Sequence, residues 1–361
     1  MSRLCLGVIA MKEDIYFNLR EHLDSLPGGY PTTGSGVEMK ILEKLFTPED
    51  ARMAVCLSRE PDSPAAIARR RGVPESEAAE QLESMARRGL ILRARSEGEV
   101  LYGAVQFLVG IYEHQLVSMD REFAELAQEY LFYIGMAQGQ HETEQVRVIP
   151  VASTIDATSD IATYDQIREL VGEKQMISVS PCVCRKQQGA LGNECERPWD
   201  ACMQFGEMAD YYIENGWGKR LSTEEALRTL DLAEEQGLVL MPDNAQDIEF
   251  VCSCCSCCCG WLRGYKMFPN PAEFLRSNYC AVKDLENCTA CLTCIERCPM
   301  DAVIESEQGI EIDPARCIGC GVCLSTCPEE AISLAPKEPT VTPPATFEEK
   351  LDRITAERGL A

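Results

Sequence analysis

The chain has 361 residues, which is too many for one small core and enough for two or three domains. A hydrophobic share of 45% and a charged share of 25% are ordinary for a globular protein, and no apolar run approaches the roughly 20 residues that span a bilayer. The net charge of −24 disfavours binding to a nucleic-acid backbone; it suits docking onto basic surfaces of redox partners and, equally, plain solubility.

The 21 cysteines are placed unevenly, because nineteen of them lie beyond residue 180 in tight groups. Spacings of one or two residues favour metal chelation over disulfide bonding. The apolar stretch at residues 4–11 is too short for a signal peptide and has no cleavage site after it. We therefore expect a reducing, cytoplasmic location, and thiolate ligands in this number suggest an anaerobic organism.

Residues 1–37 are predicted to be a lead segment with a helix from Asp14 to Ser25 and a glycine-rich linker. Residues 38–105 follow, with helices predicted to begin at Pro48 and Pro64, each after a capping hydroxyl residue. The pattern continues with a third helix over 75–88 and a hairpin over 90–104. This order of helix, helix-turn-helix and hairpin resembles the winged-helix fold.

The rest of the chain is predicted to contain four segments. Residues 106–145 form a helical connector, 146–275 a cysteine-rich metal-binding domain, 278–335 a two-cluster module, and 336–361 a proline-rich linker with a tail helix. Ser222 and Glu225 have the spacing of a capping box for a helix that ends at Gly237. The predicted fold class is thus a multidomain α+β protein.

Residues 278–335 contain an internal repeat. The run C-x2-C-x2-C-x3-C-P begins at Cys288 and recurs 29 residues later at Cys317, and Ala302 and Ala331 keep the same offset. The repeat resembles bacterial ferredoxins with two [4Fe–4S] clusters. That resemblance implies that the fourth cysteine of each run ligates the other cluster. It assigns one cluster to Cys288, Cys291, Cys294 and Cys327, and the second to Cys317, Cys320, Cys323 and Cys298. A hairpin about Gln308 and Gly309 is expected to shield the clusters from water.

Ten more cysteines lie in the middle domain, at Cys182, Cys184, Cys195, Cys202, Cys252, Cys254, Cys255, Cys257, Cys258 and Cys259. Six cysteines in eight positions require at least one metal centre, so one or two further iron–sulfur clusters are predicted, with zinc or thiol redox chemistry as alternatives. The simplest ligand set is Cys182, Cys184, Cys195 and Cys202, with a second centre on the 252–259 run. Ligation mixed between the two groups is equally open. Arg185 and Lys186 are candidates to offset the charge of such a centre.

The whole chain resembles a group of iron–sulfur proteins of anaerobic bacteria and archaea for which no reaction is established. Three cysteines, Cys5, Cys56 and Cys280, are expected to pack rather than to ligate. The histidines His22, His114 and His141 are scattered and form no catalytic motif.

Three functions compete. The leading hypothesis is an electron-transfer protein or subunit that relays electrons to a partner oxidoreductase, since no nucleotide or flavin fingerprint is present. The first alternative is a reductase with its own active cluster or dithiol in the middle domain. The second is a redox-sensing winged-helix regulator, which the glutamates at the start of the 75–88 helix disfavour. The sequence leaves open the oligomeric state and whether any substrate is converted.

Overall fold

The computed structural model describes residues 14–96, 98–151, 165–284, 286–307 and 309–360. The expectations for residues 4–11 and for Cys5 lie outside these residues, as do Glu97, within the predicted 90–104 hairpin, and the predicted turn residue Gln308. Contacts divide the chain into two units. Unit 1 contains residues 1–142, 186–193 and 351–361, and unit 2 contains residues 143–185 and 194–350. The six predicted segments are a finer division, which stays a prediction.

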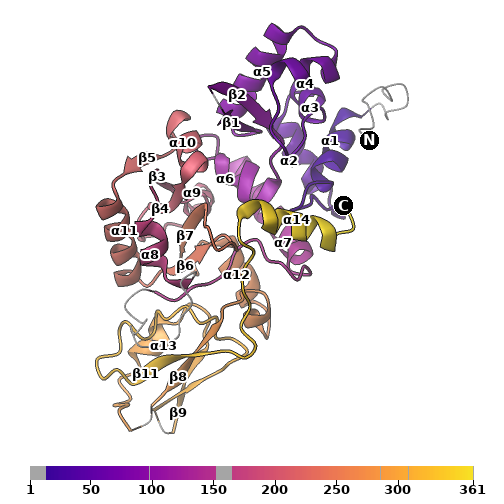
Figure 1. The fold of residues 1–361 in the computed structure, drawn as a ribbon. Helices are drawn as coiled ribbons and strands as arrows, with labels where there is room; N and C mark the ends of the chain where they lie inside the picture. The colour runs from indigo at the N-terminus through magenta and orange to yellow at the C-terminus, as the bar shows by residue number, and fades with distance from the viewer. Residues whose placement is uncertain (1–13, 97, 152–164, 285, 308, 361) are drawn as a thin grey trace. The chain divides into compact units, whose positions relative to one another are not determined.

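The described part of unit 1 starts with five helices and a hairpin, which can be followed in Figure 1. The elements are α1 (Ile15–Asp24), α2 (Val37–Leu45), α3 (Pro48–Ala54), α4 (Pro64–Arg71), α5 (Glu75–Arg87), β1 (Leu92–Ser96) and β2 (Glu99–Gly103). The predicted caps form, since Thr47 and Asp50 make a reciprocal capping box and Ser63 accepts from the Ala66 N–H. Helix α3 ends at Ala54, and Val55 caps it.

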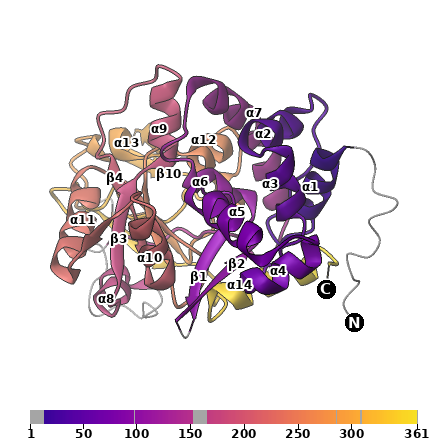
Figure 2. The same ribbon diagram turned by 90° about the horizontal axis from the view of Figure 1, so that it is seen from above.

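The hairpin β1–β2 lies beside α4 and α5, as Figure 2 shows. The chain continues through a kinked turn, η2 (Phe107–Ile111), and a short helix, α6 (Tyr112–His114), into α7 (Arg121–Gln138). These elements confirm the helical prediction for 106–145 in part. The rings of Tyr30, Phe107 and Tyr130 meet at centroid distances of 4.8–5.3 Å and form an aromatic core in unit 1.

Unit 2 is built on a five-stranded antiparallel sheet in the order β5-β3-β4-β7-β6. The strands are β3 (Ile177–Pro181), β4 (Asp200–Phe205), β5 (Lys219–Leu221), β6 (Val239–Pro242) and β7 (Phe250–Cys254). Two helices pack on the sheet, α10 (Gly206–Glu214) and α11 (Thr223–Glu235), and α8 (Ile167–Gly172) packs on α11. The predicted capping box of Ser222 and Glu225 opens α11. Helices α9 (Val183–Ala190) and α12 (Gly260–Lys266) follow cysteines that lie just beyond the ends of β3 and β7.

The C-terminal part of unit 2 contains the repeat region. A one-turn helix, η5 (Pro271–Glu273), precedes two small antiparallel pairs. Strand β8 (Tyr279–Lys283) pairs with β11 (Ile332–Pro336), and β9 (Val303–Ser306) pairs with β10 (Gly309–Ile312). Helix α13 (Thr293–Arg297) lies between β8 and β9 in the chain. The predicted hairpin is therefore confirmed, and Val303 and Ile310 lie in a buried core with the thiols of Cys294, Cys317 and Cys323.

The tail helix α14 (Phe347–Glu357) forms as predicted, and its first turn belongs to unit 2. Lys350 and Asp243 are both fully buried, with Nζ 3.7 Å from the carboxylate. The Lys350 ammonium also donates to the Gln145 carbonyl and lies 4.0 Å from the centre of the Phe347 ring. A buried ion pair thus fixes the start of α14 to the sheet.

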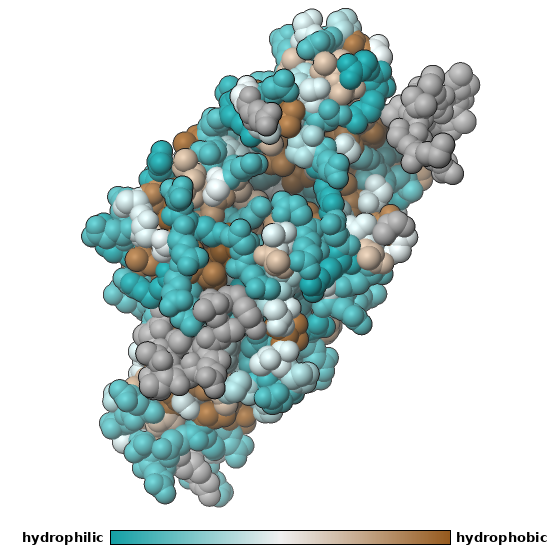
Figure 3. Space-filling view, in the orientation of Figure 1, coloured by the Kyte–Doolittle hydropathy of each residue, from teal (hydrophilic) through white to brown (hydrophobic). Residues whose placement is uncertain are grey.

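The visible face of the molecule is mainly hydrophilic, with hydrophobic residues in small separate groups (Figure 3). Among the described residues, no helix has the length and apolar character needed to cross a membrane. The mixture of helices and antiparallel sheet confirms the α+β class.

We expect stability to depend on the ionisation of Glu249. Burial, with Asp243 and Glu348 nearby, raises the pKa of Glu249 to about 8. A raised carboxyl pKa means that the folded state holds a proton that the unfolded state has lost, so stability falls between about pH 4.5 and pH 8. The substitution Glu249→Gln should increase the free energy of unfolding at pH 9 by about 1 kcal/mol or more, and so raise the thermal midpoint there. At pH 5 it should leave the midpoint unchanged.

The matched control for this prediction is Glu305→Gln, which removes an exposed carboxylate from β9. Thermal melts of the three proteins at both pH values provide the measurement. An equal change at pH 5 and pH 9 in the Glu249→Gln variant would show that the carboxyl group does not titrate in this range.

Candidate metal centres

The two halves of the repeat have the same local geometry. The Ala302 N–H donates to the Cys298 sulfur at 3.2 Å, and the Ala331 N–H donates to the Cys327 sulfur at 3.3 Å. The two arrangements are 29 residues apart in the sequence. Backbone N–H groups that point at sulfur stabilise a thiolate ligand, so each C-P corner prepares its cysteine in the same way.

Three turn positions are left-handed in both halves. Ala290, Leu292 and Asp301 have φ values of 54°, 62° and 54°, and their partners Gly319, Gly321 and Glu330 have φ values of 65°, 75° and 50°. Left-handed backbone is unfavourable for residues with a Cβ, so its recurrence at six positions shows that the turns are determined by the loop and not by residue preference. These turns bring successive cysteines of each run to one side.

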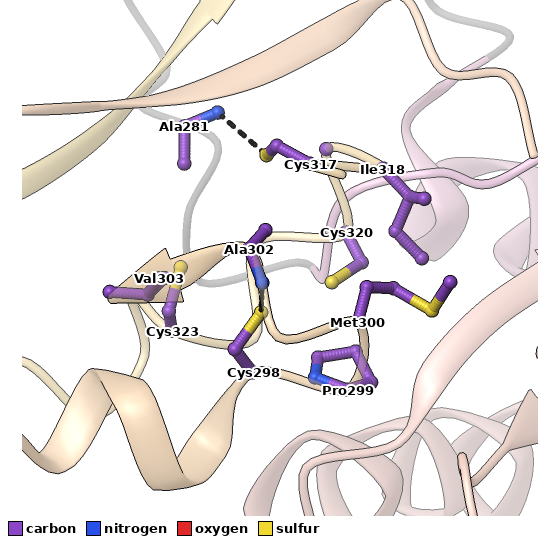
Figure 4. A pocket seen from close by; sticks show the side chains of 12 residues that line it. Ala281, Cys298, Pro299, Met300, Ala302, Val303, Cys317, Ile318, Cys320 and Cys323 are labelled. Carbon is purple, nitrogen blue, oxygen red and sulfur yellow. Dashed lines mark hydrogen bonds between the residues drawn. The ribbon is translucent and has the colours of Figure 1, made fainter. Parts of the chain in front are cut away.

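One cavity in the repeat region is lined by Cys298, Cys317, Cys320 and Cys323. These are the four cysteines that the resemblance to two-cluster ferredoxins assigns to one cluster, and they come from both runs. Figure 4 shows their sulfur atoms turned toward the common space, with Pro299, Met300 and Ile318 around it. A space with four thiol donors and apolar walls fits a cubane, because such a cluster needs four thiolates and little water.

The other four cysteines of the repeat also come together. The charges of Cys291, Cys327 and Cys288 all act on Cys294, whose pKa burial raises. Cys294 in turn acts on Cys323 of the first set. The two sets are thus neighbours, which suits electron exchange between them.

Cys317 shows how the surroundings favour a ligand. A hydrogen bond from the Cys280 thiol lowers the pKa of Cys317 to about 6, although burial of Cys317 acts in the opposite direction. The Ala281 N–H, which donates to the Cys317 sulfur at 3.3 Å, also lowers this pKa. The thiolate is the form that binds metal. Cys280 therefore contacts a predicted ligand, although its own predicted role is packing.

The ten middle cysteines all lie in unit 2 and separate into two groups. The first, here called the four-thiol group, contains Cys195, Cys255, Cys257 and Cys258, whose sulfurs all lie within 4.8 Å of one another. Cys195 is 3.9 Å from Cys255 and 3.6 Å from Cys257, and Cys257 is 3.8 Å from Cys258. Cys195 comes from the loop before β4, and the other three come from the turn after β7.

The second group, here called the six-thiol ring, contains Cys182, Cys184, Cys259, Cys254, Cys252 and Cys202, and each contacts the next in this order. Side-chain hydrogen bonds join each neighbouring pair and close the ring from Cys202 to Cys182. Cys202 and Cys252 are direct partners on β4 and β7, with sulfurs 3.8 Å apart. Cys252 and Cys254 are two residues apart on β7, so both side chains lie on the same face of the sheet.

The structure thus groups these residues differently from the simplest prediction. Cys195 joins three residues of the 252–259 run, while Cys182, Cys184 and Cys202 join the other three. This arrangement corresponds to the mixed alternative. The binding of metal by these ten residues stays a prediction.

Arg185 lies between the two groups. Its side chain is 1% exposed, and it donates to the Pro198 and Ser253 carbonyls. Burial lowers the pKa of Arg185, but the charges of Cys182 and Cys255 outweigh it and the net shift is upward. The guanidinium therefore remains a buried cation beside both thiol groups. Lys186, the other predicted counter-charge, belongs to unit 1.

The remaining candidate residues lie outside these groups. The three histidines belong to unit 1, and burial lowers the pKa values of His22 and His114 to about 4, so both are neutral. Cys56 is also in unit 1 and donates to the Arg52 carbonyl. It is half-buried, and its predicted packing role is compatible with that place.

No curated protein and no solved structure matches this chain. One family does match, over residues 280–328, and its model describes a 4Fe–4S dicluster domain. This range holds all eight cysteines of the repeat. The chain therefore carries a ferredoxin-like module with [4Fe–4S] clusters in its C-terminal part, and its chemistry is iron–sulfur electron transfer.

Proposed function

We propose that the chain is an electron carrier that accepts single electrons at its ferredoxin-like module and passes them to a partner oxidoreductase. The observation that carries the proposal is the cavity lined by cysteines of both runs, with the second set of four beside it. Two such centres within one small core provide a path for electrons. The residues present supply thiolates, N–H donors and apolar walls, and the bound clusters supply the electron storage.

Acidic surfaces support the choice of a protein partner. With a net charge of −24, the chain attracts partners that present basic patches, and this attraction should weaken with salt.

The test is an electron-transfer assay on the full chain, purified without oxygen. A ferredoxin reductase with NADPH should reduce the protein, which should in turn reduce cytochrome c. The variant Cys298→Ser removes one ligand of the cavity and should slow the transfer at least tenfold, a loss of about 1.4 kcal/mol or more in transition-state stabilisation. The variant Cys56→Ser is the control and should transfer electrons at the original rate. Clusters that no low-potential donor reduces would contradict the proposal.

The six-thiol ring supports a further [4Fe–4S] cluster in the middle domain. Six thiols that touch in a closed order exceed the four that a cubane binds, and strands β4 and β7 fix two of them in register. The ring accounts for the six cysteines better than disulfides do, because each sulfur contacts two neighbours and none has a single partner.

A reductase is the second candidate, and the surplus of two thiols in the ring favours it. Two thiols can reduce a substrate disulfide by thiol–disulfide exchange, which leaves them joined as a disulfide, and a cluster bound beside them would return two electrons, one at a time, which together with two protons restore the thiols. Reduction of a model disulfide by the pre-reduced protein, with two electrons spent per disulfide, would favour this function over a simple relay.

A DNA-binding regulator has less support. Four arginines of the winged-helix-like segment pair with carboxylates in the same unit. Arg70 pairs with Asp62, Arg87 and Arg93 with Glu83, and Arg88 with Asp50. The neighbouring carboxylates neutralise these arginines, so their attraction to a phosphate backbone is weaker. If the chain bound duplex DNA with an affinity that decreases steeply as salt is added, the regulator would be favoured over the electron carrier.

A further inference from the structure

The four-thiol group differs in scale from the ferredoxin ligand sets. Three pairs of its sulfurs are 3.6–3.9 Å apart, and all four sulfurs lie within 4.8 Å of one another. The eight cysteines of the repeat, all of which are described, form no set as tight as this. The two kinds of site are therefore built for metal centres of different size.

The distances fit a single ion. A metal–sulfur bond of about 2.3 Å and tetrahedral angles place the ligand sulfurs about 3.8 Å apart. In a cubane each thiolate binds a different iron at an outer corner, so the sulfurs lie clearly farther apart. The observed spacing agrees with the first arrangement.

Local structure holds the four thiols in place. Strand β7 ends at Cys254, and a turn follows in which the Cys258 and Cys259 N–H groups both donate to the Cys255 carbonyl, at 3.3 and 3.0 Å. This turn presents Cys255, Cys257 and Cys258 together, and it sends Cys254 and Cys259 to the six-thiol ring. The separation into four and six thus follows from one turn.

Arg185 supplies a second, independent observation. Its guanidinium contacts the Cys255 thiol, and its Nε is buried with no hydrogen-bond partner within the described part of the chain. A divalent ion with four thiolates carries a net charge of −2. A buried cation beside it lowers the cost of burying that charge.

We propose that Cys195, Cys255, Cys257 and Cys258 bind one tetrahedral divalent ion, zinc or iron, without inorganic sulfide. Zinc in this site would be structural and redox-inert, and it would join the loop at Cys195 to the turn after β7. Iron in this site is an additional one-electron centre close to the six-thiol ring. Tetrahedral sites with four sulfur ligands select these two metals.

The test compares metal and acid-labile sulfide in the full chain, purified without oxygen. Cubanes contribute equal amounts of iron and sulfide, so total metal should exceed sulfide by about one atom per chain. The variant Cys257→Ser should lose about one metal atom and no sulfide. Cys257 is exposed, which favours folding of the variant. Cys195→Ser tests the other side of the same site, and Cys56→Ser is the matched control that should lose nothing.

The identity of the lost metal separates the two forms. Loss of zinc would show that the site is structural. Loss of one iron, together with the high-spin ferric signal that appears when the wild-type protein is oxidised with ferricyanide, would show that it is a redox centre. Cells grown with Co²⁺ should yield a protein with the visible bands of tetrahedral cobalt thiolate, absent in Cys257→Ser. Loss of about four irons with about four sulfides from this variant would overturn the proposal in favour of a cubane. Equal metal and sulfide in the wild-type chain would overturn it as well, whether or not the variants fold.

Discussion

Gly319→Ala is expected to remove one of the two ferredoxin clusters. Gly319 has φ 65°, and a Cβ at this position would overlap the Tyr279 carbonyl oxygen and lie 2.8 Å from the Ser277 hydroxyl. Strand β8 cannot withdraw easily, because it pairs with β11 along its whole length. Left-handed strain and overpacking together cost at least about 2–3 kcal/mol.

The expected damage falls on the ligands, because Gly319 lies between Cys317 and Cys320. A shift of β8 also breaks the hydrogen bond from the Ala281 N–H to the Cys317 sulfur. The variant should therefore lose about four irons and four sulfides per chain, together with one cluster's EPR signal.

The internal repeat provides the matched control. Ala290 occupies the equivalent turn position with φ 54°, so Ala290→Gly changes one methyl group at the same place in the other run. It relieves left-handed strain and should retain the full iron content. Full iron content in Gly319→Ala would show that β8 can move without disturbing the ligands.

Lys350→Met is expected to destabilise unit 2 strongly. The substitution leaves Asp243 fully buried, 0% exposed, without the ammonium group 3.7 Å away. Arg147 donates to the Asp243 carbonyl, and its charge also acts on the Asp243 carboxyl, so it offsets part of this loss. Breaking a buried pair from one side costs about 3–5 kcal/mol, which corresponds to a decrease of roughly 10 °C in the thermal midpoint of a unit of this size.

The double variant Asp243→Asn with Lys350→Met separates charge from packing. The amide that replaces the carboxylate keeps an oxygen able to accept the Glu249 N–H, which donates to the Asp243 side chain at 2.9 Å. With both charges removed, most of the lost stability should return. Thermal melts of the two variants provide the measurement, and an equally low midpoint in both would mean that the other contacts of the Lys350 ammonium, to the Gln145 carbonyl and the Phe347 ring, stabilise this region instead of the charge pair.

The parts of the fold that depend on short spacing could be predicted from the sequence. Ser222 and Glu225 lie three residues apart and form their capping box, and the pattern around Pro48 and Pro64 gives two helices with the expected starts. The repeat of four cysteines with offset 29 indicates a two-cluster module, which the family match at 280–328 supports. Each of these signals acts within one or two turns of the chain, so neighbouring residues determine it.

The grouping of the middle thiols could not be predicted in this way. Cys195 and Cys257 are 62 residues apart, and Cys202 and Cys252 are 50 residues apart. Their contacts depend on the pairing of β4 with β7, and a one-residue change in that register would turn Cys252 to the other face of the sheet. Spacing alone therefore left several groupings of these thiols open, and the tertiary structure shows which of them lie together.

The buried charges show the same division. Arg185 was recognised beside its cysteines because it is their neighbour in the sequence, but its burial between two thiol groups depends on the carbonyls of Pro198 and Ser253. Lys350 lies among several other charged residues of the tail helix, and nothing in the sequence of that helix indicates that it is buried. The sequence by itself determined which side chains can bind metal and where local turns begin. Only the tertiary structure decided which of them meet, because the free energy that joins distant segments comes from burial and strand pairing and not from local spacing.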